Sequence, residues 1–440
     1  WGGEEGDECY VNQELLNESG IWNCPHDAED GSDLCVFHLP VDEKNDEKVH
    51  KAFINAIEEA TSSDDTDTRD RKSQFLGGRF GELQLNENSI DTLAETVEIE
   101  MAHTQINNLL KWSVDVSHIS FRGATFFGKI MFDSTAIGKA DFLEAEFESE
   151  SDFSHVEFDG IAEFTNSIFK EEADFSNAIF NGKSDFSSVL FRKKVDFYEA
   201  RFAGDANFRH IETNQESNFR YVEYAQKVDF HEADFEKEAD FGSAIFRGEA
   251  DFGSAVFRGK TNFGYTEIGG GTSFISAKFD SKTKFRAAEM NGKILFGSAK
   301  FGYETDFSAV VFSGEAEFGN ATFEGKVEFS STKFKKEADF GVAKFEEETN
   351  FSSIVFKERT DFGSATFEGE IDFWSTVFEE KGRFALSEFT KSVDFSSVEF
   401  GGEANFESAE FCGDVDFRDV KFGGETKFSF VAFGGESIFE

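Results

Sequence analysis

Proline and long apolar runs are scarce in this sequence, and each scarcity narrows the class of protein. The 440 residues include two prolines but 39 glycines, a balance that suits a regular repeat better than domains joined by linkers. No stretch of about 18 consecutive apolar residues occurs, so we expect no segment that spans a membrane. Four cysteines are too few for a disulfide scaffold.

Basic residues are also few relative to acidic ones. The chain has 43 Lys and Arg against 88 Asp and Glu, a formal net charge of −45. Direct binding to nucleic acid or to an anionic membrane needs a basic surface, so both are excluded. Three interpretations of the acidity stay open: solubility in high salt, a solubilised repeat surface without further meaning, and mimicry of the phosphate track of DNA.

A catalytic arrangement is missing as well. The eight His are scattered, and no Ser-His-Asp or Cys-His arrangement is legible. Gly-Gly pairs such as Gly401-Gly402 are not followed by a helix pattern, so they do not predict phosphate-binding loops. We therefore predict that the chain is not an enzyme.

Phenylalanine follows a period of eleven residues from position 142 to position 439. Every eleventh residue in this stretch is Phe, as at Phe142, Phe153 and Phe164, and a second series lies five residues after the first, as at Phe147 and Phe158. Glycine and β-branched residues recur throughout, so the period does not fit a helix. One unit cannot bury its own Phe but stacked units can, so the pattern predicts a solenoid.

Residues 173–183 read ADFSNAIFNGK, which contains the half-units ADFSN and AIFNG. This pattern resembles the pentapeptide-repeat family, whose consensus is A-(D/N)-(L/F)-(S/T)-x, over roughly residues 121–440. The resemblance implies an all-β fold, a right-handed four-sided parallel β-helix whose central aromatic and small residue two before it point inward. This chain departs from the plain family because steps of five and six residues alternate, which gives about 22 residues per coil and a bulge or wider turn at two corners.

The residue before each first-series Phe faces outward and is mostly Asp or Asn, as at Asp141, Asp185 and Asp229. Such residues would form two acidic ladders with carboxylates about one strand spacing apart. The favoured interpretation is local, because Asp and Asn side chains bond nearby backbone N–H groups in Asx-turns.

The N-terminal segment, residues 1–45, contains most of the Cys in the spacing C-x14-C-x-H-x8-C-x2-H. We predict a structural Zn²⁺ bound by Cys9, Cys24, Cys35 and His38, with His26 as the competing ligand, because Zn²⁺ takes four N or S ligands and so short a segment needs a staple to fold. The alternatives are a Cys9–Cys24 or Cys24–Cys35 disulfide, or free thiols.

Two less regular segments precede the repeat. Residues 46–61 place Val49, Ala52, Phe53, Ala56 and Ile57 at helical spacing, which predicts a short amphipathic helix, and the polar residues 61–70 predict an acidic linker within 46–73. Residues 74–440 are predicted to form the β-helix, irregular to about 120 and regular from 121. Residues 99–112 break the pattern and predict an insertion or a short helix.

The second Phe series fails at four positions, which are Thr213, Tyr224, Ile268 and Met290. Basic and aromatic side chains gather near the first two failures. On so acidic a chain they indicate a patch for a partner, for which the candidates are Tyr198, Arg209, Arg220, Tyr224 and His231. The alternative is drift in a tolerant repeat.

The first functional hypothesis is a non-enzymatic β-helical scaffold or protein-interaction rod, acidic and salt-adapted, that binds a protein partner or itself. The alternatives are a structural subunit that stacks through its coil ends, a DNA mimic that inhibits an enzyme such as gyrase, and the soluble part of a membrane channel protein. A cytoplasmic location is favoured, and the cell surface stays an alternative because the chain starts at Trp1 rather than Met.

Overall fold

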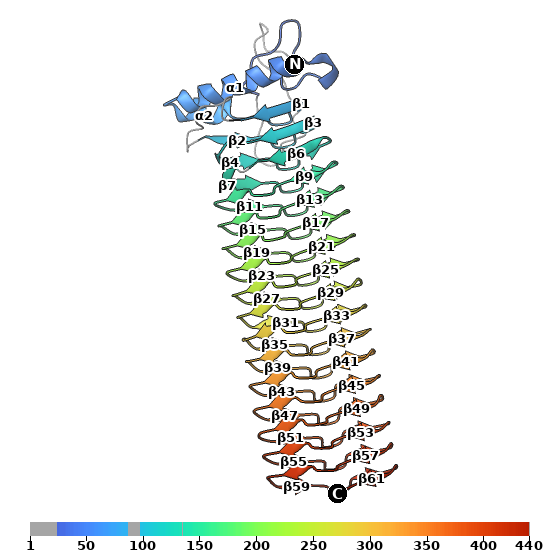
Figure 1. Cartoon of the computed structure of the whole chain (residues 1–440). Coiled ribbons are helices and arrows are strands. Elements are labelled where there is room, and N and C mark those ends of the chain that lie inside the picture. Colours follow the sequence, from blue (N-terminus) through green and yellow to red (C-terminus); the bar gives the residue numbers. More distant parts are fainter. Residues whose placement is uncertain (1–23, 87–96, 134, 440) are drawn as a thin grey trace. The chain divides into compact units, whose positions relative to one another are not determined.

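The computed structural model describes residues 24–86, 97–133 and 135–439. The chain divides into two compact units, Trp1–Gln215 and Glu216–Glu440, and each is described by itself. Both are parallel β-solenoids with about 22 residues per turn, about 16 turns in all (Figure 1). The predicted all-β solenoid is therefore confirmed. Its handedness and four-sided cross-section stay predictions.

Two helices belong to the first unit. After a short 3₁₀ turn, η2 (Val41–Glu43), comes α1 (Asp46–Ser62), whose first turn is capped by the Asn45 side chain accepting from the Lys48 N–H. Its buried face includes Val49, Phe53 and Ile57, which confirms the predicted helix. The prediction of an acidic linker was wrong in part, because these residues include the helix α2 (Thr66–Lys72). The Asp65 side chain caps it by accepting from the Thr68 N–H.

All but one of the first seven strands are longer than those of the regular repeat, the exception being the two-residue β5. They are β1 (Arg79–Leu85), β2 (Glu98–Glu100), β3 (Gln105–Trp112), β4 (Val116–Ser120), β5 (Thr125–Phe126), β6 (Lys129–Phe132) and β7 (Ala136–Asp141). β1 pairs with β3, and β2 pairs with β4, all in parallel. The helix or insertion expected over 99–112 is thus wrong, since these residues supply β2 and β3 of the solenoid itself.

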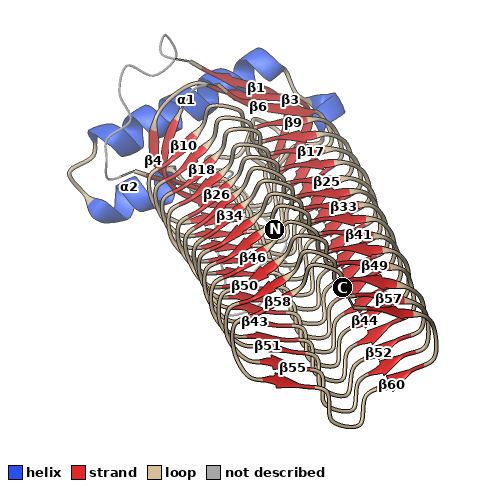
Figure 2. Ribbon diagram, turned by 60° about the horizontal axis from the view of Figure 1, so that its bottom comes forward, coloured by secondary structure: helices blue, strands red, loops and turns tan. Residues whose placement is uncertain are grey.

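In the regular coils, two-residue strands alternate with turns (Figure 2). One kind ends just before a first-series Phe and the other ends on a second-series residue. In the first unit they are β8 (Glu146–Phe147), β9 (Ser151–Asp152), β10 (Glu157–Phe158), β11 (Ala162–Glu163), β12 (Ile168–Phe169), β13 (Ala173–Asp174), β14 (Ile179–Phe180), β15 (Ser184–Asp185), β16 (Leu190–Phe191), β17 (Val195–Asp196), β18 (Arg201–Phe202), β19 (Ala206–Asn207) and β20 (Glu212–Thr213). The second unit follows the same rule from β21 (Ser217–Asn218) to β61 (Ser437–Ile438).

Phenylalanine fills the interior of the coils. In the second unit the Phe241 ring stacks on Phe219 and Phe263, one coil to either side, with centroids 4.8 and 4.7 Å apart. It meets Phe230 and Phe252 edge-to-face at 5.5 Å. All five rings are fully buried. Offset stacks between coils and T-shaped pairs across the bore are the two arrangements that aromatic quadrupoles favour.

Each first-series Phe starts a tight turn. In residues 174–178 the Ser176 N–H donates to Asp174 Oδ1 over 2.8 Å, and the Ala178 N–H donates to the Phe175 carbonyl over 3.1 Å. Asn177 between them has a φ of 57°, the left-handed region. The same side-chain acceptor recurs at Asp152, Asp196, Asp229, Asp251, Asp306 and Asp394, which confirms the predicted Asx-turns.

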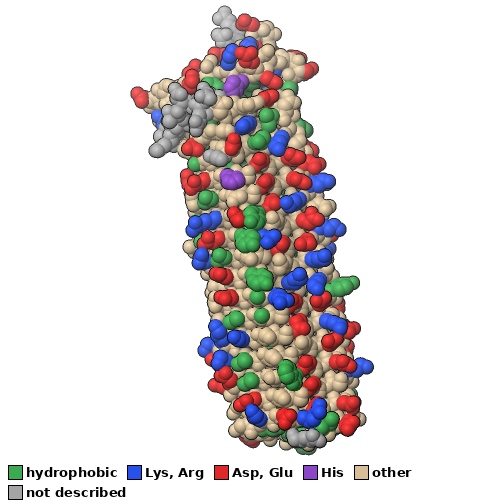
Figure 3. Space-filling model, in the orientation of Figure 1, with side chains coloured by type: hydrophobic (Ala, Val, Ile, Leu, Met, Phe, Trp, Pro, Cys, Tyr) green, Lys and Arg blue, Asp and Glu red, His purple; other side chains and the backbone are tan. Residues whose placement is uncertain are grey.

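Charged side chains cover the outside. On the face shown in Figure 3, Asp and Glu side chains lie among Lys and Arg side chains. Many of these pairs join residues 22 apart, as in Lys282–Glu304 and Lys336–Glu358 of the second unit, so they connect neighbouring coils. None of the helices in the described ranges is long and apolar enough to cross a membrane.

Candidate metal centre and acidic groove

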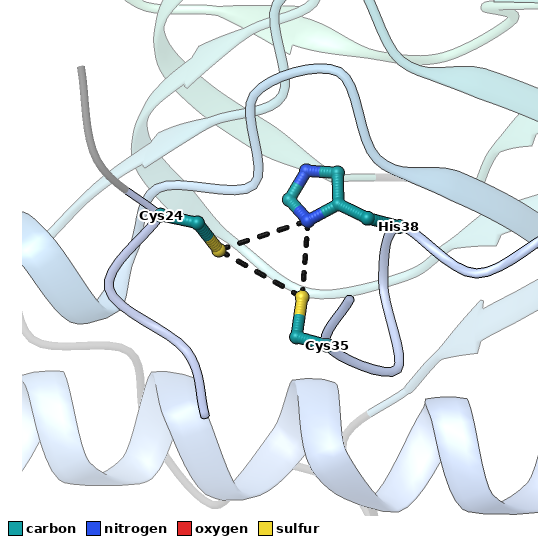
Figure 4. A group of neighbouring side chains, drawn as sticks. All are labelled: Cys24, Cys35 and His38. Carbon is teal, nitrogen blue, oxygen red and sulfur yellow. Dashed lines mark hydrogen bonds between the residues drawn. The ribbon is translucent and has the colours of Figure 1, made fainter. Parts of the chain in front are cut away.

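Three predicted metal ligands meet in the N-terminal module, by which we mean residues 24–85. One turn carries both Cys35 and His38, because the His38 N–H donates to the Cys35 carbonyl over 3.0 Å. An antiparallel bridge from Cys35 to Ala28 brings Cys24 alongside this turn (Figure 4). Cys24 is 3% exposed, Cys35 0% and His38 6%, so the group is closed to solvent.

Two of the three distances within this group match the edges of a tetrahedral zinc site, and the third is shorter by about 0.5 Å. The two sulfurs lie 3.7 Å apart, and His38 Nδ1 lies 3.7 Å from Cys24 Sγ and 3.0 Å from Cys35 Sγ. Around a zinc ion with ordinary bond lengths, two thiolates stand roughly 3.7 Å apart and a thiolate and an imidazole nitrogen about 3.5 Å apart. A disulfide between Cys24 and Cys35 needs about 2.05 Å, so these two sulfurs are not bonded.

A backbone carbonyl orients the His38 ring. Nε2 lies 2.8 Å from the Leu76 carbonyl, and since a carbonyl only accepts, Nε2 carries the proton. Nδ1 then presents its lone pair to the two sulfurs. Metal-bound histidines commonly donate their other ring nitrogen in this way, which holds the tautomer and the orientation needed for binding.

The remaining predicted ligands have different outcomes. Cys9 lies outside the described residues. His26 is not in the group: its Nε2 lies 2.9 Å from the Gln74 carbonyl, and its ring stacks on Phe75 with centroids 5.1 Å apart. The geometry thus favours His38 over His26 as the ligand, because His26 is held in the aromatic core of the module.

That aromatic core joins the module to the first coil. Phe53 of α1 packs against Phe75 with centroids 4.4 Å apart, and Phe37, one residue before His38, meets Phe75 edge-to-face at 5.0 Å. The Arg79 N–H at the start of β1 donates to the Phe37 carbonyl over 2.7 Å. The turn that carries the ligands, the helix and the first strand are therefore mutually positioned.

A groove of about 420 Å³ lies on the second unit over five neighbouring parallel strands. These are β45 (Thr349–Asn350), β49 (Ile371–Asp372), β53 (Val393–Asp394), β57 (Val415–Asp416) and β61. Its lining includes Glu348, Glu370, Asp372, Asp394, Asp414, Asp416 and Glu436 and no Lys or Arg. We call this the acidic groove.

Most of these carboxylates form no ion pair with a described Lys, Arg or His. Lys326 pairs with Glu348 and Arg418 with Asp416, but within the part of the chain that the structure describes no ion pair reaches the other five. Partial burial raises the pKa of Asp372 above its usual value, against the hydrogen bond from the Trp374 N–H, and the Asp394 carboxylate raises it further. The groove thus concentrates unpaired negative charge, whereas many carboxylates elsewhere on the second unit are paired with Lys or Arg.

The predicted partner patch fares differently residue by residue. Tyr224 is 1% exposed, because its ring takes the place of a second-series Phe inside the second unit and stacks on Phe246 at 5.1 Å. Its place in a surface patch was therefore wrong. Tyr198 and Arg209 are half-buried on the first unit, and on the second Arg220 is exposed and His231 half-buried. Their binding role stays a prediction.

Comparison with known families agrees with the repeat geometry. The family model of pentapeptide repeats matches in nine copies, including residues 142–190, 164–212, 175–223 and 384–432. The chain belongs to the pentapeptide-repeat family. No curated protein matches the chain. The pentapeptide-repeat coils account for the Phe core and the Asx-turns, whereas the Cys and His of the N-terminal module lie before all four of these matched ranges.

Proposed function

We propose that this pentapeptide-repeat protein is a non-enzymatic binding scaffold whose acidic groove receives a Lys- or Arg-rich segment of a protein partner. The observation that supports this most is the contrast in charge balance on the second unit. Coil-to-coil pairs such as Lys282–Glu304 neutralise carboxylates elsewhere, whereas five carboxylates of the groove form no ion pair among the described residues.

Electrostatics makes a basic segment the matching ligand. Strands in neighbouring coils lie about 4.8 Å apart, so Asp372, Asp394 and Asp416 form a row of closely spaced like charges. Such a row is costly alone: burial is the main cause of the raised pKa of Asp372, and the Asp394 carboxylate raises it further. Cationic side chains that entered the groove would remove the repulsion, and the surrounding field would speed their approach.

The test is binding of a fluorescent lysine-rich peptide to the full chain, followed by anisotropy. The groove variant is Asp372→Asn/Asp394→Asn/Asp414→Asn, in which each amide oxygen keeps the acceptor that now bonds the N–H of Trp374, Ser396 or Glu436. We expect it to bind at least about tenfold more weakly, since removing charges that meet a cation costs over 1 kcal/mol.

The matched control removes the same charge from carboxylates that already have lysine partners. It is Glu304→Gln/Glu315→Gln/Glu358→Gln, also on the second unit. Less than a twofold change is expected. Equal losses in the two triple variants would mean that the peptide senses only net charge, and the proposal would fail.

For the N-terminal module we propose a structural Zn²⁺ held by Cys24, Cys35 and His38, with Cys9 as the fourth ligand. The support is that the three side chains are buried together, that the two distances from Cys24 Sγ match zinc–ligand geometry, and that Leu76 orients His38. Bound zinc would join the ligand turn to Cys24 across 11 residues that contain few apolar side chains.

Metal analysis of the purified chain tests this proposal. We expect about one zinc per chain, and its loss in Cys35→Ser. The control is Cys412→Ser, which changes an exposed free cysteine of the second unit and should retain the zinc. A chain that folds and holds no zinc after purification in zinc-containing medium would overturn it.

A further inference from the structure

A second group of metal-ligating side chains lies at the start of the first unit, and neither the zinc centre nor the repeat accounts for it. Glu98 and Glu100 belong to β2, and His118 belongs to β4. One ligand atom from each lies within 4.8 Å of the others. We call these three residues the Glu–Glu–His cluster.

The pairing of β2 with β4 creates this cluster. In the parallel register Glu98 lies opposite His118 and Glu100 lies opposite Ser120. Residues two apart on a strand point to the same side, so the four side chains form a square on one face of the two strands. Figure 1 shows β2, β4 and β7 following one another in this part of the first unit.

The histidine ring is held so that it presents one nitrogen to the carboxylates. His118 Nδ1 lies 3.1 Å from Glu98 Oε2, while Nε2 is buried without a hydrogen-bond partner in the described ranges. The His118 side chain is 12% exposed, which limits its rotation. Two ligands that share a metal ion with bonds of about 2.1 Å stand roughly 3.0–3.4 Å apart, so the Nδ1–Oε2 distance already fits.

The surroundings of the Glu100 carboxylate contain more negative than positive charge. Burial raises its pKa above the usual value, and the Asp141 and Glu98 carboxylates raise it further, against the Ser120 hydrogen bond and the nearby His118. Asp141 does not compete for a cation, because both Nε and Nη2 of Arg122 donate to it, over 3.2 and 2.9 Å. Lys139, opposite His118 on β7, is exposed.

We propose that Glu98, Glu100 and His118 bind a divalent first-row transition-metal ion at the junction of β2 and β4. Two carboxylates and one imidazole are an N/O ligand set that suits Mn²⁺ or Zn²⁺ better than Ca²⁺ or Mg²⁺, which prefer oxygen ligands alone. The ion would neutralise Glu100 and clamp β2 to the next coil, at the place where the irregular strands give way to the repeat.

Binding of Mn²⁺ to the full chain, measured by loss of its free electron paramagnetic resonance signal, tests the proposal. Mn²⁺ avoids thiolates, so the cysteine centre does not interfere, particularly once it is filled with zinc. Salt at about 150 mM with added Mg²⁺ suppresses diffuse binding to the acidic surface. We expect one Mn²⁺ site, weakened at least about tenfold in His118→Gln and in Glu100→Gln.

Two further variants make the result decisive. Glu98→Gln changes a residue whose side chain is 67% exposed, so the fold survives, and it too should weaken binding by about tenfold. Glu163→Gln is the matched control, a carboxylate on the same face next to Asp141 but without a histidine beside it, and should leave binding unchanged. Unchanged affinity in Glu98→Gln and His118→Gln, or an equal loss in Glu163→Gln, would overturn the proposal.

Discussion

The N-terminal module and the pentapeptide-repeat coils bury their side chains by opposite means. In the coils, Phe rings recur at the same place in successive turns, so Phe241 stacks on Phe219 and Phe263 and meets Phe230 and Phe252 edge-to-face. In the module, Phe37, Phe53 and Phe75 pack at differing angles without a repeat, and the polar side chains of Cys35 and His38 are buried as well. The repeated Phe rings supply stability to the coils, whereas the buried thiols and imidazole that could bind zinc lie before the repeat.

Removing metal should separate the two regions most strongly. The apparent binding free energy of zinc in small modules is on the order of 10 kcal/mol, so a chelator or Cys35→Ser should abolish hydrogen-exchange protection in α1. Amides of the coils around Phe241 should keep theirs. Simultaneous loss of protection in both regions would mean that the module and the coils are a single cooperative unit.

A large cavity in the coils should come next. Phe241→Ala removes a fully buried ring with six aromatic neighbours, so we expect the free energy of unfolding of the second unit to fall by about 3–5 kcal/mol in urea titrations. The comparison variant is Phe430→Ala, whose ring is 87% exposed and should change it by less than about 0.5 kcal/mol. Similar costs for both would contradict the account of the core.

A buried turn carboxylate should contribute less than a core ring. Asp185 accepts from the Ser187 N–H and from Asn207 Nδ2 over 3.1 and 2.8 Å. Burial alone would raise the pKa of Asp185, but hydrogen bonds from Ser187, Asn207 and Lys183 hold it below its usual value. Asp185→Ala should therefore cost about 1.5–3 kcal/mol at neutral pH in denaturant titrations.

The pH dependence of that cost has a defined sign. A lowered folded-state pKa contributes stability above the unfolded value of about 3.9, and this contribution is lost as pH falls through the folded pKa. The difference between the parent and Asp185→Ala should shrink in that window. Asp185→Asn keeps an acceptor oxygen and serves as the control for the hydrogen bonds alone.

The smallest expected effect is a gain at a strained turn. Val342 has a φ of 61°, which is unfavourable for a β-branched residue, and its side chain is 58% exposed. Val342→Asn copies Asn320, the residue 22 positions earlier with a φ of 58°, and should stabilise the second unit by up to about 1 kcal/mol in urea titrations. Ser364→Asn at the same corner should change little, and a loss in Val342→Asn would refute the strain argument.

The sequence predicts the coils well because their signal is repeated. The Phe period, the inward Ala residues and the Asx-turns all follow from patterns that recur every 11 residues. Single elements are harder to predict. Residues 61–70 look like an acidic linker by composition, although the Asp65 cap and the basic last turn of α2 are signals of a helix. Tyr224 looks like a surface residue by its type, although its position in the second Phe series predicts burial.

The sites depend on register, which the sequence does not state outside the repeat. Cys35 and His38 could be paired from their spacing, since one turn supplies both ligands. His118 meets Glu98 only because β2 and β4 pair with a separation of 20 residues instead of the 22 of the regular coils. The acidic groove likewise combines residues from five coils, and its missing lysines become visible only when the coils are stacked.

X-ray absorption at the zinc edge of the full chain is the most direct test of the claim that Cys24, Cys35 and His38 of the N-terminal module bind zinc. The account predicts sulfur neighbours at about 2.3 Å together with imidazole nitrogen at about 2.0–2.1 Å, and loss of the sulfur shell in Cys35→Ser. A spectrum with only oxygen and nitrogen neighbours would show that the bound zinc lies outside the cysteine centre, and would contradict it.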